Sequence, residues 1–214
     1  MRKLQSLVDA PGVVDDGSED QTAQRAQEAD ARVLQQPLNR GYGASLKKGI
    51  WASEADFIAI TDADGTYPVE RLPDLLAQID NGADMAVGRR TGQHYWSSLI
   101  KNPLRVIYMW LCSFAAGGAI PDGNSGLRVF RRTDVLKNEA HLCMGFSFTT
   151  SLSLAMVAAD KDVRWVEIDY LARVGKSKVR LFRDGLRTAQ YILQTVIRFN
   201  PVKLALIPFS LFFA

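Results

Sequence analysis

The chain contains 214 residues, of which 47% are hydrophobic, and carries a formal net charge of +3. This length and apolar content suit one domain with a buried core, and so slight a charge argues against nucleic acid as a partner. The two cysteines, Cys112 and Cys143, and the two isolated histidines exclude a disulfide framework and a zinc site. We expect both thiols to be inert, in a reducing compartment.

The first part of the chain alternates short apolar runs with helical segments. Residues 13–14 end a short strand, the acidic turn DDGS follows at 15–18, and a helix over 22–30 precedes a second strand at 31–34. The sequence NRGYG at 39–43 forms a glycine-rich loop ahead of a helix at 44–53, where the backbone can approach a phosphate closely. This loop matches neither the Walker spacing nor the dinucleotide fingerprint, so alone it is a weak signal.

Two carboxylates follow the apolar run FIAI at 57–60, which is typical of a buried strand in a parallel sheet. Asp62 and Asp64 stand where such sheets bind ligands, and two negative charges this close are costly unless a cation lies between them. Carboxylate oxygens suit Mg2+ or Mn2+, either of which keeps positions open for phosphate oxygens. The alternative is a solvated turn in which Asp62 caps the next helix.

The alternation continues through most of the chain and predicts an α/β fold with parallel strands. We expect helices over 69–79, 96–116 and 145–159 and strands over 83–87 and 163–172, and residues 122–130 pass from a tight turn into a further strand. The apolar stretch at 96–116 is interrupted by two charges, so we interpret it as a helix lying over a groove rather than a membrane span.

The C-terminal part combines positive charge with apolar surface. Residues 173–203 include eight basic side chains and a single acidic one, Asp184. The pattern over 182–199 predicts an amphipathic helix with a basic face, and its apolar face consists of Phe182, Leu186, Ala189, Leu193 and Val196. The apolar end at 202–214 is too short to cross a bilayer core of about 30 Å, and we interpret it as the beginning of a membrane helix. A buried C-terminal core helix is the alternative.

Seven motifs in this order resemble family 2 glycosyltransferases of the GT-A fold, in particular the polyprenyl-phosphate branch that includes dolichyl-phosphate mannose synthase. The motifs are VDDGS at 14–18, NRGYGA at 39–44, DADGTYP at 62–68, GR at 88–89, Asp122 with SGLR at 125–128, GFSF at 145–148 and YLARVGKSK at 170–178. Each is modest alone, and their shared order makes the resemblance specific.

The resemblance implies a Rossmann-like α/β fold with a mostly parallel central sheet and flanking helices. By this similarity, 1–180 form the catalytic domain, 181–200 a juxtamembrane amphipathic helix and 201–214 a truncated membrane segment. The expected reaction is metal-dependent transfer of a sugar, with inversion, from a nucleotide-sugar to a polyprenyl phosphate such as undecaprenyl or dolichyl phosphate.

The resemblance also assigns site residues. The nucleotide would contact Asp15, Asp16, Gly41 and Asp62, and the Mg2+ or Mn2+ would be held by Asp62 and Asp64. The expected catalytic residues are Asp122 and Asp64. The departing diphosphate or the acceptor phosphate would be bound by Arg89, Ser125, Arg128, Arg173, Ser177 and Lys178. Because a phosphate monoester is already ionised at neutral pH, a strong general base is not required, and Asp122 is expected to orient the acceptor or assist the metal.

The expected partners are therefore a UDP- or GDP-sugar, a polyprenyl phosphate and an anionic membrane surface, with a homo-oligomer left open. The expected location is the cytoplasmic face of the cell membrane, held peripherally or by C-terminal helices. The basic helix and the apolar end would both favour an anionic inner leaflet.

Two other interpretations remain open on these residues. An Asp-x-Asp after a strand also opens haloacid-dehalogenase-type phosphatases, in which Asp62 would be the nucleophile and Asp64 the acid/base. That class needs a later aspartate pair for magnesium, and only scattered acids follow. The third interpretation is a truncated glycosyltransferase that binds without turnover.

The start of the chain departs from the family pattern, which opens with a strand and a helix before the acidic turn. In the family's sheet that strand lies between the strands ending at Val14 and Ile60. Without it, both strands would present unpaired backbone groups, each costing roughly 1–3 kcal/mol when buried. We therefore hypothesise a fragment that is poorly stable and weakly active.

Overall fold

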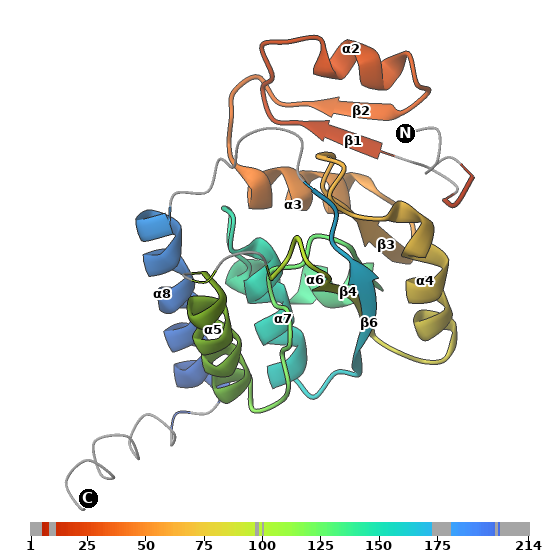
Figure 1. Ribbon diagram of the computed structural model, residues 1–214. Helices are drawn as coiled ribbons and strands as arrows, with labels where there is room; N and C mark the ends of the chain where they lie inside the picture. Colours follow the sequence, from red (N-terminus) through yellow and green to blue (C-terminus); the bar gives the residue numbers. More distant parts are fainter. Residues whose placement is uncertain are drawn as a thin grey trace, which may run out of the picture.

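Two β-sheets, flanked by helices, form the framework of the chain (Figure 1). The computed structural model describes residues 6–8, 12–96, 99, 101–172, 181–199 and 201. The smaller sheet pairs β1 (Gly12–Asp15) in parallel with β2 (Arg32–Gln35), and α2 (Thr22–Gln27) connects them. This small sheet packs against the rest of the molecule through α3 (Tyr42–Ala52).

The larger sheet has four strands in the order β3-β5-β4-β6. Its strands are β3 (Phe57–Ile60), β4 (Met85–Thr91), β5 (Arg128–Arg131) and β6 (Val163–Asp169). β4 and β6 are parallel, and β5 runs antiparallel to both β3 and β4. Three of the four strands therefore point the same way, so their carboxyl ends meet at one edge of the sheet.

Alternating residues of the larger sheet face two separate hydrophobic clusters. On one face Met85 and Phe130 pack with the helix α7 (Phe148–Ala158). On the other face Ala86 and Val129 pack with α4 (Leu72–Asp80), which follows the 3-10 turn η1 (Val69–Arg71). This two-residue period is what a strand covered on both sides requires.

A helical layer covers the α7 side of the sheet. α5 (Lys101–Ala116) and α8 (Leu181–Phe199) lie side by side and both pack on α7 (Figure 1). α7 is buried over 148–156 because its two sides contact the sheet cluster and a third cluster shared with α5 and α8. A short α6 (Arg132–Lys137) and the 3-10 turn η2 (Glu139–His141) complete the fold.

The expected elements are present, with shifts of a few residues at their ends. The helix expected at 96–116 begins at Lys101, and the amphipathic helix spans Leu181–Phe199. We did not expect α6, which follows β5 without a loop. Within the described residues β1 pairs only with β2, and β3 only with β5, so these two strands are not neighbours.

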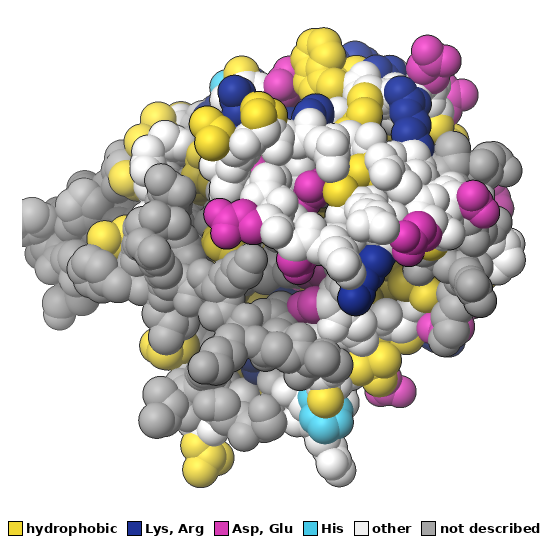
Figure 2. Space-filling view, turned by 90° about the horizontal axis from the view of Figure 1, so that it is seen from above, with side chains coloured by type: hydrophobic (Ala, Val, Ile, Leu, Met, Phe, Trp, Pro, Cys, Tyr) yellow, Lys and Arg dark blue, Asp and Glu magenta, His cyan; other side chains and the backbone are white. Residues whose placement is uncertain are grey.

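Among the residues with described positions, no helix is both long and apolar enough to span a bilayer. The apolar end at 202–214 and residues 173–180 lie outside the described residues. Seen from the β1–β2 end, the described residues carry acidic and basic side chains interspersed over the surface (Figure 2).

Candidate active site

The paired carboxylates lie in the loop that leaves the carboxyl end of β3. Asp62 accepts a hydrogen bond on Oδ1 from the hydroxyl of Tyr42 at 2.9 Å. Its carboxylate covers the backbone of Gly126, where a Cβ would come within 2.6 Å of Oδ2. Asp64 accepts bonds from the amide and the hydroxyl of Thr66, at 3.1 and 2.6 Å. These contacts hold both carboxylates at the edge where the parallel strands end.

Asp122 forms the second charged centre of the site. It is only 2% exposed, and its two oxygens accept bonds from Arg90 Nε and Nη2 at 2.8 and 2.7 Å. The Arg90 amide adds a third bond at 3.0 Å. Burial lowers the pKa of Arg90, but the hydrogen bonds and charge of Asp122 outweigh it, so the pKa lies well above its ordinary value. The two side chains therefore form a bidentate ion pair of fixed geometry.

Arg89, expected to bind phosphate, and its neighbour Arg90 on the same strand pair with different carboxylates. Arg89 pairs with Glu167 at 3.2 Å, with 44% of its side chain exposed, and its role at a phosphate stays a prediction. Arg90 is the residue that reaches Asp122, because successive side chains of a strand point to opposite faces. The rings of Tyr95 and Tyr170 lie 4.8 and 5.3 Å from its guanidinium carbon.

Ser125 and Arg128, also expected to bind phosphate, make hydrogen bonds to the protein itself. Both are fully buried. Ser125 donates to the carbonyl of Gly88, and Arg128 donates to the carbonyls of Gly123, Ser125 and Thr149 and to Ser153 Oγ. The guanidinium donors of Arg128 are therefore bonded to backbone carbonyls and to one serine side chain of the protein itself. The two residues therefore hold the 122–126 loop against β4 and α7, and their expected contact with a phosphate stays a prediction.

The acidic turn after β1 anchors the glycine-rich loop. Asp16 accepts bonds from the amides of Arg40 and Gly41, both at 2.8 Å, and from Gln36 Nε2 at 2.9 Å. Gly41 has φ +98°, a conformation that other residues rarely adopt. Asp15 is buried and accepts from the Ser18 amide at 3.2 Å. The structure thus joins Asp16 with Gly41, and both aspartates are engaged in loop contacts; their contact with a nucleotide stays a prediction.

Tyr67 connects the two charged centres across the floor of the site. Its hydroxyl accepts a bond from the Gly126 amide at 2.7 Å, directly beneath the Asp62 carboxylate. Burial, more than the nearby charges of Asp62 and Asp122, raises the pKa of Tyr67 to about 12. Burial and then the charge of Asp62 raise the pKa of Tyr42 well above its ordinary value, so both hydroxyls keep their protons at physiological pH.

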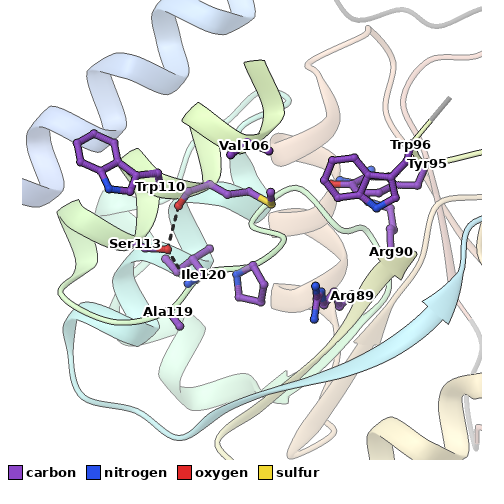
Figure 3. Close-up of a pocket in the computed structure, with 11 residues that line it drawn as sticks. Arg89, Arg90, Tyr95, Trp96, Val106, Trp110, Ser113, Ala119 and Ile120 are labelled. Carbon is purple, nitrogen blue, oxygen red and sulfur yellow. Dashed lines mark hydrogen bonds between the residues drawn. The ribbon is translucent and has the colours of Figure 1, made fainter. Parts of the chain in front are cut away.

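A pocket of about 340 Å³ opens beside Arg90 (Figure 3). Arg89, Arg90, Tyr95 and Trp96 line one end, and Trp110 and Ser113 of α5 lie at the other, with apolar side chains between them. Ser113 Oγ accepts from the Ile120 amide and donates to the Met109 carbonyl, which fixes the apolar wall. The pocket is therefore cationic at one end and apolar along its length.

A second pocket of about 480 Å³ adjoins the glycine-rich loop. Its walls come from three segments, namely 39–42, 143–146 and the α8 residues Gln190 and Tyr191. Arg173, Ser177 and Lys178, expected near the phosphates, lie outside the described residues.

Sequence reasoning missed Arg90, Tyr67 and Tyr42. Strand alternation on β4 could have identified Arg90, whereas no local pattern signals the contacts of the two tyrosines. In the described part of the chain, no three His, Cys, Asp or Glu side chains come together as a metal cluster.

Comparison with known proteins identifies the family of the chain. Residues 12–151 match the sequence profile described as glycosyl transferase family 2. The chain belongs to this family. Membership confirms the resemblance seen in the motifs and does not support the phosphatase interpretation of Asp62 and Asp64.

Two curated relatives are similar in sequence to most of the chain. It is 31% identical over 194 residues to a low-salt glycan biosynthesis hexosyltransferase of Haloferax volcanii, covering 85% of this chain and 45% of that protein. It is 27% identical over 183 residues to a dolichyl-phosphate hexose transferase of the same organism, covering 85% and 79%. The chain thus spans less than half the length of one curated relative and about four-fifths of the other.

The fold also matches solved structures. Glucosyl-3-phosphoglycerate synthase from Mycobacterium tuberculosis, in complex with Mn2+, UDP and glucosyl-3-phosphoglycerate, superposes with a TM-score of 0.66 at 21% identity. The match covers 90% of this chain and 70% of that chain. This similarity confirms the predicted GT-A type of α/β fold.

Proposed function

We propose that the protein transfers a sugar from a nucleotide-sugar to a polyprenyl phosphate in a metal-dependent, inverting reaction. The observation that carries the proposal is the arrangement at the strand ends: the carboxylates Asp62 and Asp64 follow β3, and at the end of β4 a pocket opens that is cationic at Arg90 and apolar along α5. A phosphate with an isoprenoid chain has this same combination of charge and apolar length. The dolichyl-phosphate hexose transferase among the relatives supports this acceptor class.

The donor side fits a divalent cation. Asp62 and Asp64 supply carboxylate oxygens, the ligands that Mg2+ and Mn2+ prefer, and no third acidic side chain completes a cage among the described residues. Such a site suits an ion that shares its coordination with substrate phosphates. When bound, the ion would neutralise the charge that develops on the leaving diphosphate. Asp16 and Gly41 would meet the nucleotide through the glycine-rich loop.

The acceptor side needs no strong base. Because the acceptor phosphate is ionised at neutral pH, it is already a nucleophile. Asp122 accepts from Arg90 on both oxygens, so it is poorly placed to take a proton. We assign it instead to orienting Arg90, whose guanidinium would meet the acceptor phosphate at the mouth of the pocket.

The experiment is a transfer assay with UDP- and GDP-sugars and undecaprenyl or dolichyl phosphate, in which mass spectrometry detects the glycolipid. Product is expected with Mn2+ or Mg2+ and is expected to disappear with a chelator. A soluble acceptor, 3-phosphoglycerate, serves as the control. Transfer to the soluble acceptor alone, or metal-independent transfer, would contradict the proposal.

We further propose that the outer faces of α5 and α8 rest on an anionic membrane. Large apolar side chains are exposed there, including Leu104, Ile107 and Trp110 of α5 and Leu186 and Leu193 of α8, each 48–62% exposed. Leu186 and Leu193 belong to the apolar face expected for the helix, and Val196 of the same face is buried. A row of this kind on adjoining helices favours a lipid interface, and the eight basic residues of 173–203 favour an anionic one. The location would then be the cytoplasmic face of the membrane.

A further inference from the structure

Tyr42 links the carboxylate of Asp62 to the wall of the second pocket. Its hydroxyl donates to Asp62 Oδ1 at 2.9 Å, while its ring stacks on Phe146 at a centroid distance of 6.0 Å and an interplanar angle of 8°. Both aromatic residues line the second pocket. One side chain therefore spans from the loop 143–146 to the carboxylate pair.

The backbone around Tyr42 is fixed from behind. The Ala44 amide donates to the Met144 carbonyl at 2.9 Å, which attaches the first turn of α3 to the loop 143–146. A Cβ on Gly43 would come within 2.3 Å of the Cys143 carbonyl, so the two segments touch at the backbone. The Tyr42 ring also packs on the core cluster that contains Phe148. The phenol is thus held in place independently of its bond to Asp62.

The Asp62 carboxylate, in contrast, needs external contacts to fix its orientation. The terminal torsion of an aspartate is broad and roughly two-fold, so the rotamer alone does not set the direction of its oxygens. The absence of a side chain at Gly126 lets the carboxylate lie flat on the loop backbone, and the Tyr42 hydroxyl selects the position of Oδ1. Outer-shell bonds of this kind orient metal-ligating carboxylates.

We propose that Tyr42 is a positioning residue whose hydroxyl holds Asp62 in the orientation that binds the divalent cation. This inference rests on the proposed function, because it assumes a cation at Asp62 and Asp64. The glycine-rich loop is expected to contact a phosphate through its backbone. This inference gives the side chain of its tyrosine a separate role, at the cation site. A purely structural Tyr42 would contribute packing through its ring and nothing through its hydroxyl.

The test compares Mn2+ binding by the full chain and its Tyr42→Phe variant, with free Mn2+ followed by electron paramagnetic resonance. The variant keeps the ring and the Phe146 stack and removes only the hydroxyl. We expect its affinity for Mn2+ to fall by about 10- to 100-fold, with a matching rise in the Mn2+ concentration needed for half-maximal transfer and a smaller change in kcat. Tyr108→Phe is the matched control, because its hydroxyl bonds to Asn124 and Thr150 and does not contact Asp62. Its Mn2+ affinity should stay within twofold of wild type.

A second variant tests the same carboxylate from the other side. Gly126→Ala places a methyl group against Asp62 and should weaken Mn2+ binding on its own. If both changes act through the orientation of Asp62, the double variant should lose less affinity than the product of the single losses. Unchanged Mn2+ affinity in Tyr42→Phe, or fully multiplicative losses, would overturn the role of Tyr42. Failure of the wild-type chain to bind Mn2+ would instead overturn the metal site itself, and with it this inference.

Discussion

Two adjacent arginines on β4 show how strongly surroundings decide the role of a residue. Arg90 is bonded twice to a carboxylate that is 2% exposed, whereas Arg89 makes a single surface contact with Glu167. Removing the partner of a buried carboxylate lowers the stability of the fold far more than breaking a surface ion pair does. Substitutions at the two positions therefore compare the loss of a buried ion pair with the loss of an exposed one.

We predict that Arg90→Ala destabilises the protein by about 3–5 kcal/mol, because Asp122 would remain buried without its counter-charge. Arg89→Ala should change stability by about 0.5 kcal/mol or less, since its ion pair is largely solvated. Urea unfolding of the two variants measures the difference. Arg90→Lys keeps the charge and loses the two-pronged geometry, so it should fall between them. Equal losses at the two positions would refute the assignment of Arg90 as the partner of Asp122.

A second prediction concerns the carboxylate pair. Asp64→Asn should abolish the Mn2+-dependent binding of UDP or GDP, because Asp62 alone would then hold the cation. Isothermal titration with Mn2+ and with a chelator measures this. The control is Asp74→Asn, whose carboxylate is 47% exposed on α4 and pairs with Arg71. Nucleotide binding that survives both the chelator and the Asp64 change would exclude a metal at this pair.

At the scale of elements, strand ends and helix faces were predictable, while strand direction and burial of polar groups were not. The continuous apolar run before Asp62 indicates the strand β3, and the helical spacing of apolar residues after Pro68 indicates the helix α4. Nothing local reveals that β5 inserts antiparallel between β3 and β4, since an apolar run reads the same in both directions. Likewise, Arg128 looks like a surface arginine until the carbonyls around it are known.

The outer faces of α5 and α8 carry the third prediction. The double variant Ile107→Gln/Leu193→Gln should reduce recovery on anionic liposomes by about tenfold or more, because burying each apolar side chain contributes about 1.5–3 kcal/mol. Trp51→Gln on α3, which removes a side chain that is 58% exposed away from this surface, should have no effect.

Liposome flotation at low and high salt separates the apolar and electrostatic contributions. Binding should weaken with salt if the basic residues of 173–203 contribute. Normal flotation of the double variant would show that another surface binds the membrane. Loss of a dimer without loss of flotation would show that a second copy of the chain covers these faces.

At the scale of the whole molecule, the site lies between two sheets that share no hydrogen-bonded strand pair in the described part of the chain. The β1–β2 unit contacts the rest mainly through α3, and Asp16 and Gly41 belong to its side of the site, whereas Asp62 and Asp64 belong to the other. A nucleotide bound with its cation would touch both. Ligand binding should therefore stabilise the weaker unit against local opening.

The last prediction follows from this arrangement and is tested by hydrogen exchange. Without ligand, the amides of β1 and β2 should exchange faster than those of β4, which is paired on both sides in the larger sheet. Mn2+ with a nucleotide at about 100 times its dissociation constant should add about 2.7 kcal/mol to the stability of the bound form, which corresponds to about a hundredfold slowing of exchange in β1 and β2. The Asp64→Asn variant should show no such slowing, because its nucleotide has no cation to join it to β3. If β1 and β2 are already protected as well as β4, or if ligand slows exchange only around β3, the two sheets do not open separately and the nucleotide does not bridge them.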